Sequence, residues 1–184
     1  EGRLTGRSSR PTTAPSRFPI DEERHVKGLT MTQPWATLVA IGANVIETRD
    51  WPTKHRGPFA IHAAKGFPAD ARALCRTQPF RAALAAGGYA SADDLPRGAI
   101  VAVVELKSLL ACGPSTLRDI RARSRRGELP PHEADFGDFS DGRYGFVLDD
   151  VRRVEPPVPA RGMLGFWDLP PDVEALVRAP SFRG

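Results

Sequence analysis

Two charged side chains stand two residues apart in a segment that alternates as a strand does. Glu47 and Arg49 belong to the predicted strand 45–50, and side chains at this spacing project to the same side of a sheet. Burying either charge without a partner is costly, so we expect the two to be paired or to line a solvated cleft. An arginine offers a planar fork of donors for a carboxylate, a phosphate or a base edge. The pair therefore indicates a polar cleft suited to a nucleotide or a nucleic acid.

Aromatic rings and an amide flank this pair. Trp35 and Trp51 offer flat faces on which a base can stack, and Gln33 carries an amide that can read a base or a sugar. Each ring also has a packing alternative. Trp35 has the helical spacing of a core residue, and both of its roles stay open. Trp51 lies beside a proline turn, a position that favours a cap on a barrel over stacking on a base.

Basic and titratable side chains continue along the chain. Arg56 and Lys65 are candidate phosphate contacts, and Arg143, at the start of a later strand, either walls the cleft or forms a structural ion pair. His62 is expected on the face of its strand opposite the apolar residues. A lone histidine is usually satisfied structurally, but beside Glu47 it could act in general acid–base catalysis. This catalytic hypothesis requires the two side chains to lie close together in the fold.

The excess positive charge is modest and local. The chain has a formal net charge of +4, which is compatible with a polyanionic partner. Four arginines lie in the first 17 residues, and five more between residues 118 and 126 are expected to be solvated on a surface loop. We interpret residues 1–24, rich in Gly, Ser, Thr, Pro and Arg, as a flexible basic arm. Residues 25–175 are predicted to form one folded domain and residues 176–184 a C-terminal tail.

Cysteines, acidic residues and hydropathy give no sign of a metal or a membrane. Cys75 and Cys112 are far apart and neither belongs to a CxxC motif, which favours free thiols in a reducing compartment. The acidic residues of segment 133–141, Glu133 among them, lack the spacing of a calcium loop and predict a solvated loop. No apolar run approaches the roughly 20 residues of a membrane span. We therefore expect a cytoplasmic protein with no metal, no cofactor and no membrane contact.

Short strands and few helices must position these residues. A helix over 33–42 fits Thr32 as its N-cap and Gly42 as its left-handed end, and the mostly apolar run 98–110 predicts a central strand. A helix over 69–86, interrupted near Pro79, and a polar excursion over 113–141 are also expected. The remaining strands are predicted at 27–32, 45–50, 59–64, 144–148, 151–154 and 165–169. This order favours a small, partly closed barrel with helices packed outside.

Several of these motifs resemble, in order and spacing, those of the ASCH family, named for homology to the activating signal cointegrator 1 protein. The resemblance runs from about residue 27 to 169. Its motifs are Gln33-Pro-Trp-Ala, Gly42-x-x-x-x-Glu47-x-Arg49-x-Trp51, Arg56-Gly57-Pro58-x-x-Ile61-His62-Ala63, Gly98-Ala-Ile-Val, Gly137-Asp-Phe-Ser-Asp-Gly-Arg-Tyr144 and Gly162-x-x-Gly-Phe-Trp167. It implies an α+β fold, a PUA-like small β-barrel with flanking helices and a cleft beside the first helix.

The resemblance also bears on activity, because family members are proposed to bind RNA, DNA or modified nucleosides and some resemble hydrolases. Members often carry a lysine where this chain has Asn44, and the small amidohydrolases pair that lysine with a threonine at the position of Glu47. This chain has neither residue, so that nucleophilic scheme cannot operate here.

The function predicted from the sequence is a domain that binds RNA, single-stranded DNA or a flipped-out DNA base in a polar, partly basic cleft. One alternative is a hydrolase, ribonuclease-like or directed at a modified nucleoside, with Glu47 and His62 as acid and base. Another is a protein-interaction domain. The expected partner is RNA, DNA or a nucleotide ligand, and the candidate binding residues are Gln33, Trp35, Asn44, Glu47, Arg49, Trp51, Arg56, Lys65 and Arg143.

Overall fold

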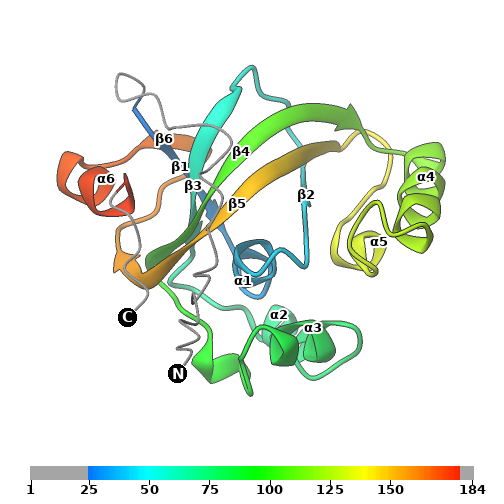
Figure 1. Cartoon of the computed structure of the whole chain (residues 1–184), viewed down its shortest axis with the longest axis horizontal. Coiled ribbons are helices and arrows are strands. Elements are labelled where there is room, and N and C mark those ends of the chain that lie inside the picture. The colour runs from blue at the N-terminus through cyan, green and yellow to red at the C-terminus, as the bar shows by residue number, and fades with distance from the viewer. Residues whose placement is uncertain (1–24, 179–184) are drawn as a thin grey trace, which may run out of the picture.

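A single curled six-stranded sheet forms a half-barrel at the centre of the protein (Figure 1). The computed structural model describes residues 25–178. The strand order is β2-β5-β4-β3-β1-β6. β1 pairs with β3 in parallel, and the other neighbours pair antiparallel. The strands are β1 (Lys27–Met31), β2 (Ile46–Arg49), β3 (Gly57–Ala63), β4 (Ala99–Ala111), β5 (Tyr144–Pro159) and β6 (Phe166–Asp168).

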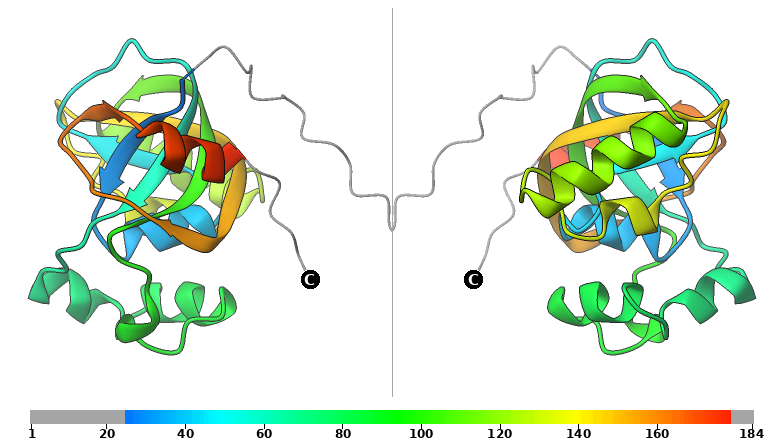
Figure 2. Two further views of the ribbon diagram at one scale, coloured as in Figure 1. Left: turned by 90° about the vertical axis from the view of Figure 1, so that its left-hand side faces the viewer. Right: turned by 90° about the vertical axis from the view of Figure 1, so that its right-hand side faces the viewer.

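Helices flank the sheet at both ends and below it (Figures 1 and 2). α4 and α5 lie at one end of the long axis and α6 at the other, while α2 and α3 both lie in a layer below α1. The helices are α1 (Trp35–Ala40), α2 (Ala69–Leu74), α3 (Phe80–Ala86), α4 (Pro114–Arg125), α5 (Glu133–Phe136) and α6 (Pro171–Arg178), with a 3-10 turn η1 (Ala92–Asp94). No described helix is long and apolar enough to span a membrane.

The two faces of β3 supply two separate cores. Phe59 and Ile61 pack with α1 and with Phe146 of β5 in the larger core. Ala60 faces the other way, into a second core that includes Trp167 of β6 and residues of α6. This division follows from the alternation of side chains along a strand, and it fixes the side of the sheet on which α1 packs.

The predicted α+β class and the central position of the strand within 98–110 are confirmed, with three corrections to local structure. Thr32 does not cap α1: the N-cap is Pro34, without a side-chain cap, and the Gln33 amide oxygen accepts from Thr37 N instead, at 3.1 Å. Segments 144–148 and 151–154 belong to one continuous strand, β5. The expected left-handed residue at the end of α1 is confirmed, since Gly42 has a φ of +72°.

The third correction concerns the polar excursion, which contains the helices α4 and α5. Pro114 occupies the first turn of α4, where its missing N–H costs nothing. Ile120 is fully buried and packs with Ile46 and Phe139, with Leu117 against the same cluster. Four of the five arginines assigned to a surface loop therefore lie on a helix that one apolar side holds against the barrel.

Residues from both ends of the described chain contact one carboxylate, that of Glu174. Glu174 of α6 accepts from Val26 N at 2.9 Å, forms an ion pair with Arg178 at 2.7 Å, and lies 3.3 Å from His25 Nδ1. Helix α6 continues to Arg178, three residues past the expected domain boundary at 175. The predicted basic arm, residues 1–24, and the last six residues lie outside the described part of the chain.

Candidate functional site

A small polar cavity opens where the edge strand β2 faces the end of β1 and the segment after α5. We call it the Glu47 pocket, and its volume is about 260 Å³. β2 is an edge strand that pairs only with β5. The cavity lies between β2 and residues of β1, α1 and α5. The lining residues are Thr30, Met31, Thr32, Trp35, Glu47, Thr48, Arg49, Phe136, Asp138 and Arg143.

An ion pair forms the charged part of this pocket. Arg49 Nε lies 2.9 Å from Glu47 Oε1, and Arg49 Nη2 donates to Thr30 O at 2.9 Å. Only 12% of the Glu47 side chain and 21% of the Arg49 side chain is exposed. Burial raises the pKa of Glu47, and the positive charges of Arg49 and Arg143 oppose that rise. The pocket thus holds a carboxylate acceptor and a guanidinium donor, both partly desolvated, where electrostatic interactions are stronger than in water.

Trp35 and Arg143 each combine a structural contact with a place on the pocket wall. Trp35 Nε1 donates to Phe136 O at 2.5 Å, and its ring meets Phe80 edge to face at 6.0 Å. Arg143 Nη2 donates to Thr48 O at 3.1 Å, and its Nε lies 3.4 Å from Asp138. Each of the two side chains therefore has a structural partner and also a position on the pocket wall.

A buried carboxylate holds the start of β2 in place. Glu133 is fully buried, and its two oxygens accept from Val45 N at 2.9 Å and Ile46 N at 2.7 Å. Burial raises its pKa to about 7, since desolvation outweighs these two hydrogen bonds and the negative Glu47 nearby adds to the rise. The prediction of a solvated acidic loop was therefore wrong for Glu133. Sequence reasoning missed its role, and only the apolar Phe136 in the same short helix hinted that one side of α5 is buried.

A larger, basic pocket of about 830 Å³ adjoins the first. Thr30 lines both cavities. Three exposed cations surround the second one, Lys65, Arg97 and Arg161. Sequence reasoning singled out Lys65 but neither arginine. Arg161 could have been found, because it directly precedes the motif that begins at Gly162. The remaining lining residues are His62, Ala64, Gly98, Pro159, Ala160 and Gly162.

His62 lies on the opposite face of β3 from Phe59 and Ile61, as predicted, and is almost fully buried. Its Nε2 lies 3.0 Å from Ala160 O, and burial lowers its pKa by disfavouring the cation. A neutral ring with the proton on Nε2 satisfies that contact. His62 and Glu47 line different pockets, so the structure does not bring the hypothetical acid–base pair into one cavity.

Four predicted binding residues lie outside both pockets. Gln33 and Asn44 are fully buried: Gln33 Nε2 donates to Pro96 O at 2.7 Å, and Asn44 Oδ1 accepts from Ile46 N at 3.3 Å. The Trp51 ring packs against Phe146 and Phe166 with centroids 5.3 and 5.9 Å apart, in the manner of a barrel cap. Arg56 is exposed and lines a separate cavity of about 640 Å³. Of the nine residues, Trp35, Glu47, Arg49 and Arg143 share the Glu47 pocket, and Lys65 lines the basic pocket.

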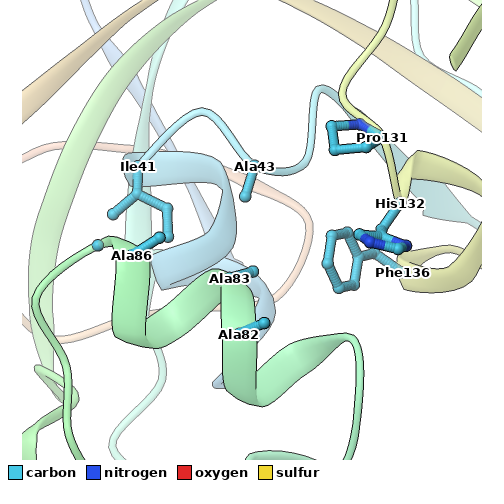
Figure 3. Close-up of a pocket in the computed structure, with 9 residues that line it drawn as sticks. Ile41, Ala43, Ala82, Ala83, Ala86, Pro131, His132 and Phe136 are labelled. Atoms are coloured by element: carbon cyan, nitrogen blue, oxygen red, sulfur yellow. The ribbon is translucent and has the colours of Figure 1, made fainter.

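An apolar cavity of about 300 Å³ lies on the other side of Phe136 (Figure 3). The alanines of α3 form one wall, and the rings of His132 and Phe136 face them from α5 and the turn before it. We call it the alanine pocket. Its lining residues are Ile41, Ala43, Ala82, Ala83, Ala86, Gly87, Pro131, His132 and Phe136. No group of three or more potential metal ligands occurs within residues 25–178.

Comparisons with known proteins give one family. The family model of the ASCH domain matches residues 29–130. Activating signal cointegrator 1 from Mus musculus is 26% identical over 141 residues, and its counterpart from Homo sapiens is 24% identical. These alignments cover 77% of this chain but 22% of each relative, so the chain spans about a fifth of their length.

Solved structures of ASCH proteins are similar at lower sequence identity. The crystal structure of ASCH from Zymomonas mobilis is 11% identical, covers 84% of this chain and 94% of its own, and has a TM-score of 0.46. A point mutant of the Zymomonas mobilis protein is 15% identical, covers 74% of this chain and 76% of its own, and has a TM-score of 0.40.

Proposed function

Because the chain belongs to the ASCH domain family, which is generally related to RNA binding, we propose that it is a nucleic-acid-binding domain for unpaired bases. The observation that carries this proposal is the junction of two cavities at Thr30. One cavity contains the Glu47–Arg49 pair and the other is surrounded by three exposed cations. Hydrogen-bonding groups for a base edge and positive charges for phosphates thus lie side by side.

The Glu47 pocket has groups that complement the polar edge of a base. The Glu47 carboxylate accepts from exocyclic amino groups, and a guanidinium such as that of Arg49 donates to ring nitrogens and carbonyl oxygens. Trp35 and Phe136 contribute apolar surface to the same cavity. The cavity of about 260 Å³ suits one base and not a stacked pair. Such a base must leave its stack, which favours single strands, RNA loops or a flipped-out nucleotide over intact duplex.

The basic pocket supplies the charge for the backbone. Lys65, Arg97 and Arg161 are exposed and come from three different connecting segments. Neutralising phosphates releases counterions, so binding weakens steeply as salt is added. The modest net charge of +4 matters less here than the gathering of these three side chains at one cavity.

The experiment is fluorescence anisotropy with labelled single-stranded RNA, single-stranded DNA and duplex DNA at 50 and 200 mM salt (about the range over which phosphate contacts respond). Arg49→Ala tests the Glu47 pocket. Lys107→Ala is the matched control, since Lys107 is an exposed cation paired with Asp149 at a separate cavity. We expect salt-sensitive binding of single strands that Arg49→Ala weakens and Lys107→Ala leaves unchanged. Binding that is absent at low salt, or equal for both variants, contradicts the proposal.

The same samples on a denaturing gel distinguish binding from hydrolysis. Intact strands are expected, because Glu47 and His62 line different pockets. Shortened strands that disappear with Glu47→Gln would instead establish the hydrolase hypothesis.

One observation favours protein interaction as a second function. The alanine pocket is lined almost entirely by apolar side chains and lies at the surface between α3 and α5. A cavity of this character accommodates an apolar side chain of a partner better than a phosphate. Ala83→Glu would place a charge there; loss of a protein partner with unchanged nucleic-acid affinity would assign the pocket to that partner.

A further inference from the structure

Two consecutive apolar residues protrude into solvent beside the basic pocket. Leu164 is 98% exposed and Met163 is 54% exposed. In the described part of the chain, the one other large exposed apolar side chain is Leu176, on α6. Isolated apolar residues on a surface are ordinary, but this adjacent pair follows directly after Arg161 and Gly162 of the basic pocket. We call Met163–Leu164 the apolar tip.

The apolar tip is anchored firmly on its N-terminal side. Ala160 O accepts from His62 at 3.0 Å, and Ala160 N donates to Gly98 O at 3.0 Å. The backbone of Gly162 passes so close to the His62 ring and to Thr30 Oγ1 that a Cβ at this position would collide with both. The chain is therefore held against β1 and β3 up to the residue before the tip.

The C-terminal side of the tip is fixed as well. Gly165 has a φ of +63°, a conformation that glycine adopts without strain. It is followed at once by β6, where Phe166 pairs with Leu29 of β1 and its ring packs on Phe59 at 5.2 Å. Two residues between fixed ends have little freedom, so ordering them on a partner costs little conformational entropy. The segment lies at the end of the sheet away from α4 and α5 (Figure 1).

The charges around the tip indicate what it contacts. Lys65, Arg97 and Arg161 line the basic pocket, and the tip follows directly after the last two lining residues, Arg161 and Gly162. A partner that meets both surfaces must present negative charge next to apolar, flat surface. A nucleic acid strand does so at every nucleotide, since each phosphate is adjacent to a base with two π faces.

We propose that Met163 and Leu164 contact the face of an unpaired base, or enter between two bases, while the phosphates of that strand lie in the basic pocket. Apolar wedges of this kind unstack bases at nucleic-acid interfaces. The inference rests on the proposed nucleic-acid function and adds to it a second base contact, outside the Glu47 pocket. It assigns the tip to the bases and the cations to the backbone.

The test compares Met163→Ser/Leu164→Ser with the control Leu176→Ser, whose leucine is also exposed but lies on α6. Affinity for a single-stranded RNA oligonucleotide is measured by anisotropy at several salt concentrations. The tip variant should bind roughly tenfold more weakly with an unchanged salt slope, since it loses base contacts and no phosphate contact. Lys65→Ala should lower the salt slope by about one. Leu176→Ser should match the wild type.

A second readout follows the bases directly. An oligonucleotide with 2-aminopurine should brighten when the wild type unstacks it, and should brighten less with the tip variant. Circular dichroism spectra of the variants should match the wild type, because the substituted side chains are exposed and leave the cores unchanged.

The outcomes separate the two proposals. If the wild type binds RNA and the tip variant binds equally well, the tip assignment is overturned and the proposed function stands. If the wild type binds no nucleic acid, both are overturned. The last experiment measures the binding of the wild type and the tip variant to vesicles containing phosphatidylserine. If the tip variant loses vesicle binding and keeps full RNA affinity, the tip belongs to a membrane surface and the assignment to bases is refuted.

Discussion

The buried carboxylate of Glu133 makes a prediction about stability whose sign can be worked out from the structure. Its pKa rises from the ordinary value of 4.5 to about 7 because burial disfavours the charged form. Between these two values the folded protein binds a proton that the unfolded chain has released. Stability therefore falls as pH rises through this window, and it levels off above pH 7.

The size of the effect follows from the same values. A rise from 4.5 to about 7, at about 1.4 kcal/mol for each pH unit, amounts to about 3 kcal/mol between pH 5 and pH 8. Glu47 changes stability in the same direction, since its pKa is also raised. His62 acts oppositely: its lowered pKa makes the folded state bind fewer protons just below pH 6.5, so its contribution grows as pH rises to that value. A comparison of variants is needed to isolate Glu133.

Glu133→Gln removes the titration and nearly preserves the volume. The amide keeps one oxygen for one of the two backbone donors, Val45 N and Ile46 N, and turns an N–H group toward the other. Leaving one buried donor unsatisfied costs about 1–3 kcal/mol. The wild type should thus be more stable than the variant at pH 5, and this difference should shrink toward pH 8.

Urea denaturation at pH 5, 6, 7 and 8 measures this difference. Glu128→Gln is the matched control, because Glu128 is exposed and its hydrogen bond from Arg126 holds its pKa below the ordinary value, so that its carboxylate stays ionised over this range. The difference in free energy of unfolding between this control and the wild type should not narrow from pH 5 to pH 8. If the difference between wild type and Glu133→Gln stays constant or widens as pH rises, then the two backbone N–H groups stabilise the ionised form more than burial disfavours it, and the reasoning is refuted.

Three further substitutions test the site and the packing around it. Glu47→Gln should change the preference among oligo-A, oligo-C, oligo-G and oligo-U in anisotropy titrations, because the amide presents a donor where the carboxylate accepts; an unchanged order of preference would remove Glu47 from base recognition. Gly162→Ala should lower stability by about 1–3 kcal/mol in a denaturation curve, since the new Cβ meets the His62 ring. Ile120→Ala should cost about 2–5 kcal/mol because Ile120 is 1% exposed on the buried side of α4, whereas the control Leu176→Ala on the surface should change stability by less than about 0.5 kcal/mol.

The proposed site depends on residues that serve two surfaces at once. Thr30 lines both the Glu47 pocket and the basic pocket, and Phe136 lines both the Glu47 pocket and the alanine pocket. A ligand that fills one cavity therefore contacts a residue that also lines the next. Titrating a nucleic acid in the presence and absence of a protein partner measures whether the two binding events are coupled.

Local rules of the sequence determined the α+β class, most strands and the relation between Glu47 and Arg49. Side chains two residues apart on a strand share a face whatever the rest of the chain does, and of the two outcomes expected for them, pairing or solvation in a cleft, the structure shows an ion pair. Gly42 ends α1 with a positive φ for a similarly local reason. The mostly apolar run within β4 indicated a central strand, and β4 lies between β3 and β5.

The tertiary structure alone decided which polar side chains face solvent and which charges meet. Nothing in the sequence distinguishes Gln33 and Asn44 from amides on the surface, yet both are buried and their side chains form hydrogen bonds with backbone groups. Glu133 reaches the start of β2 across 87 residues of sequence. Lys65, Arg97 and Arg161 gather only because the pairing of β3 with β4 and of β4 with β5 brings the segments after β3, before β4 and after β5 together. Periodicity reports the neighbours of a residue along the chain, whereas a site is made of neighbours in space.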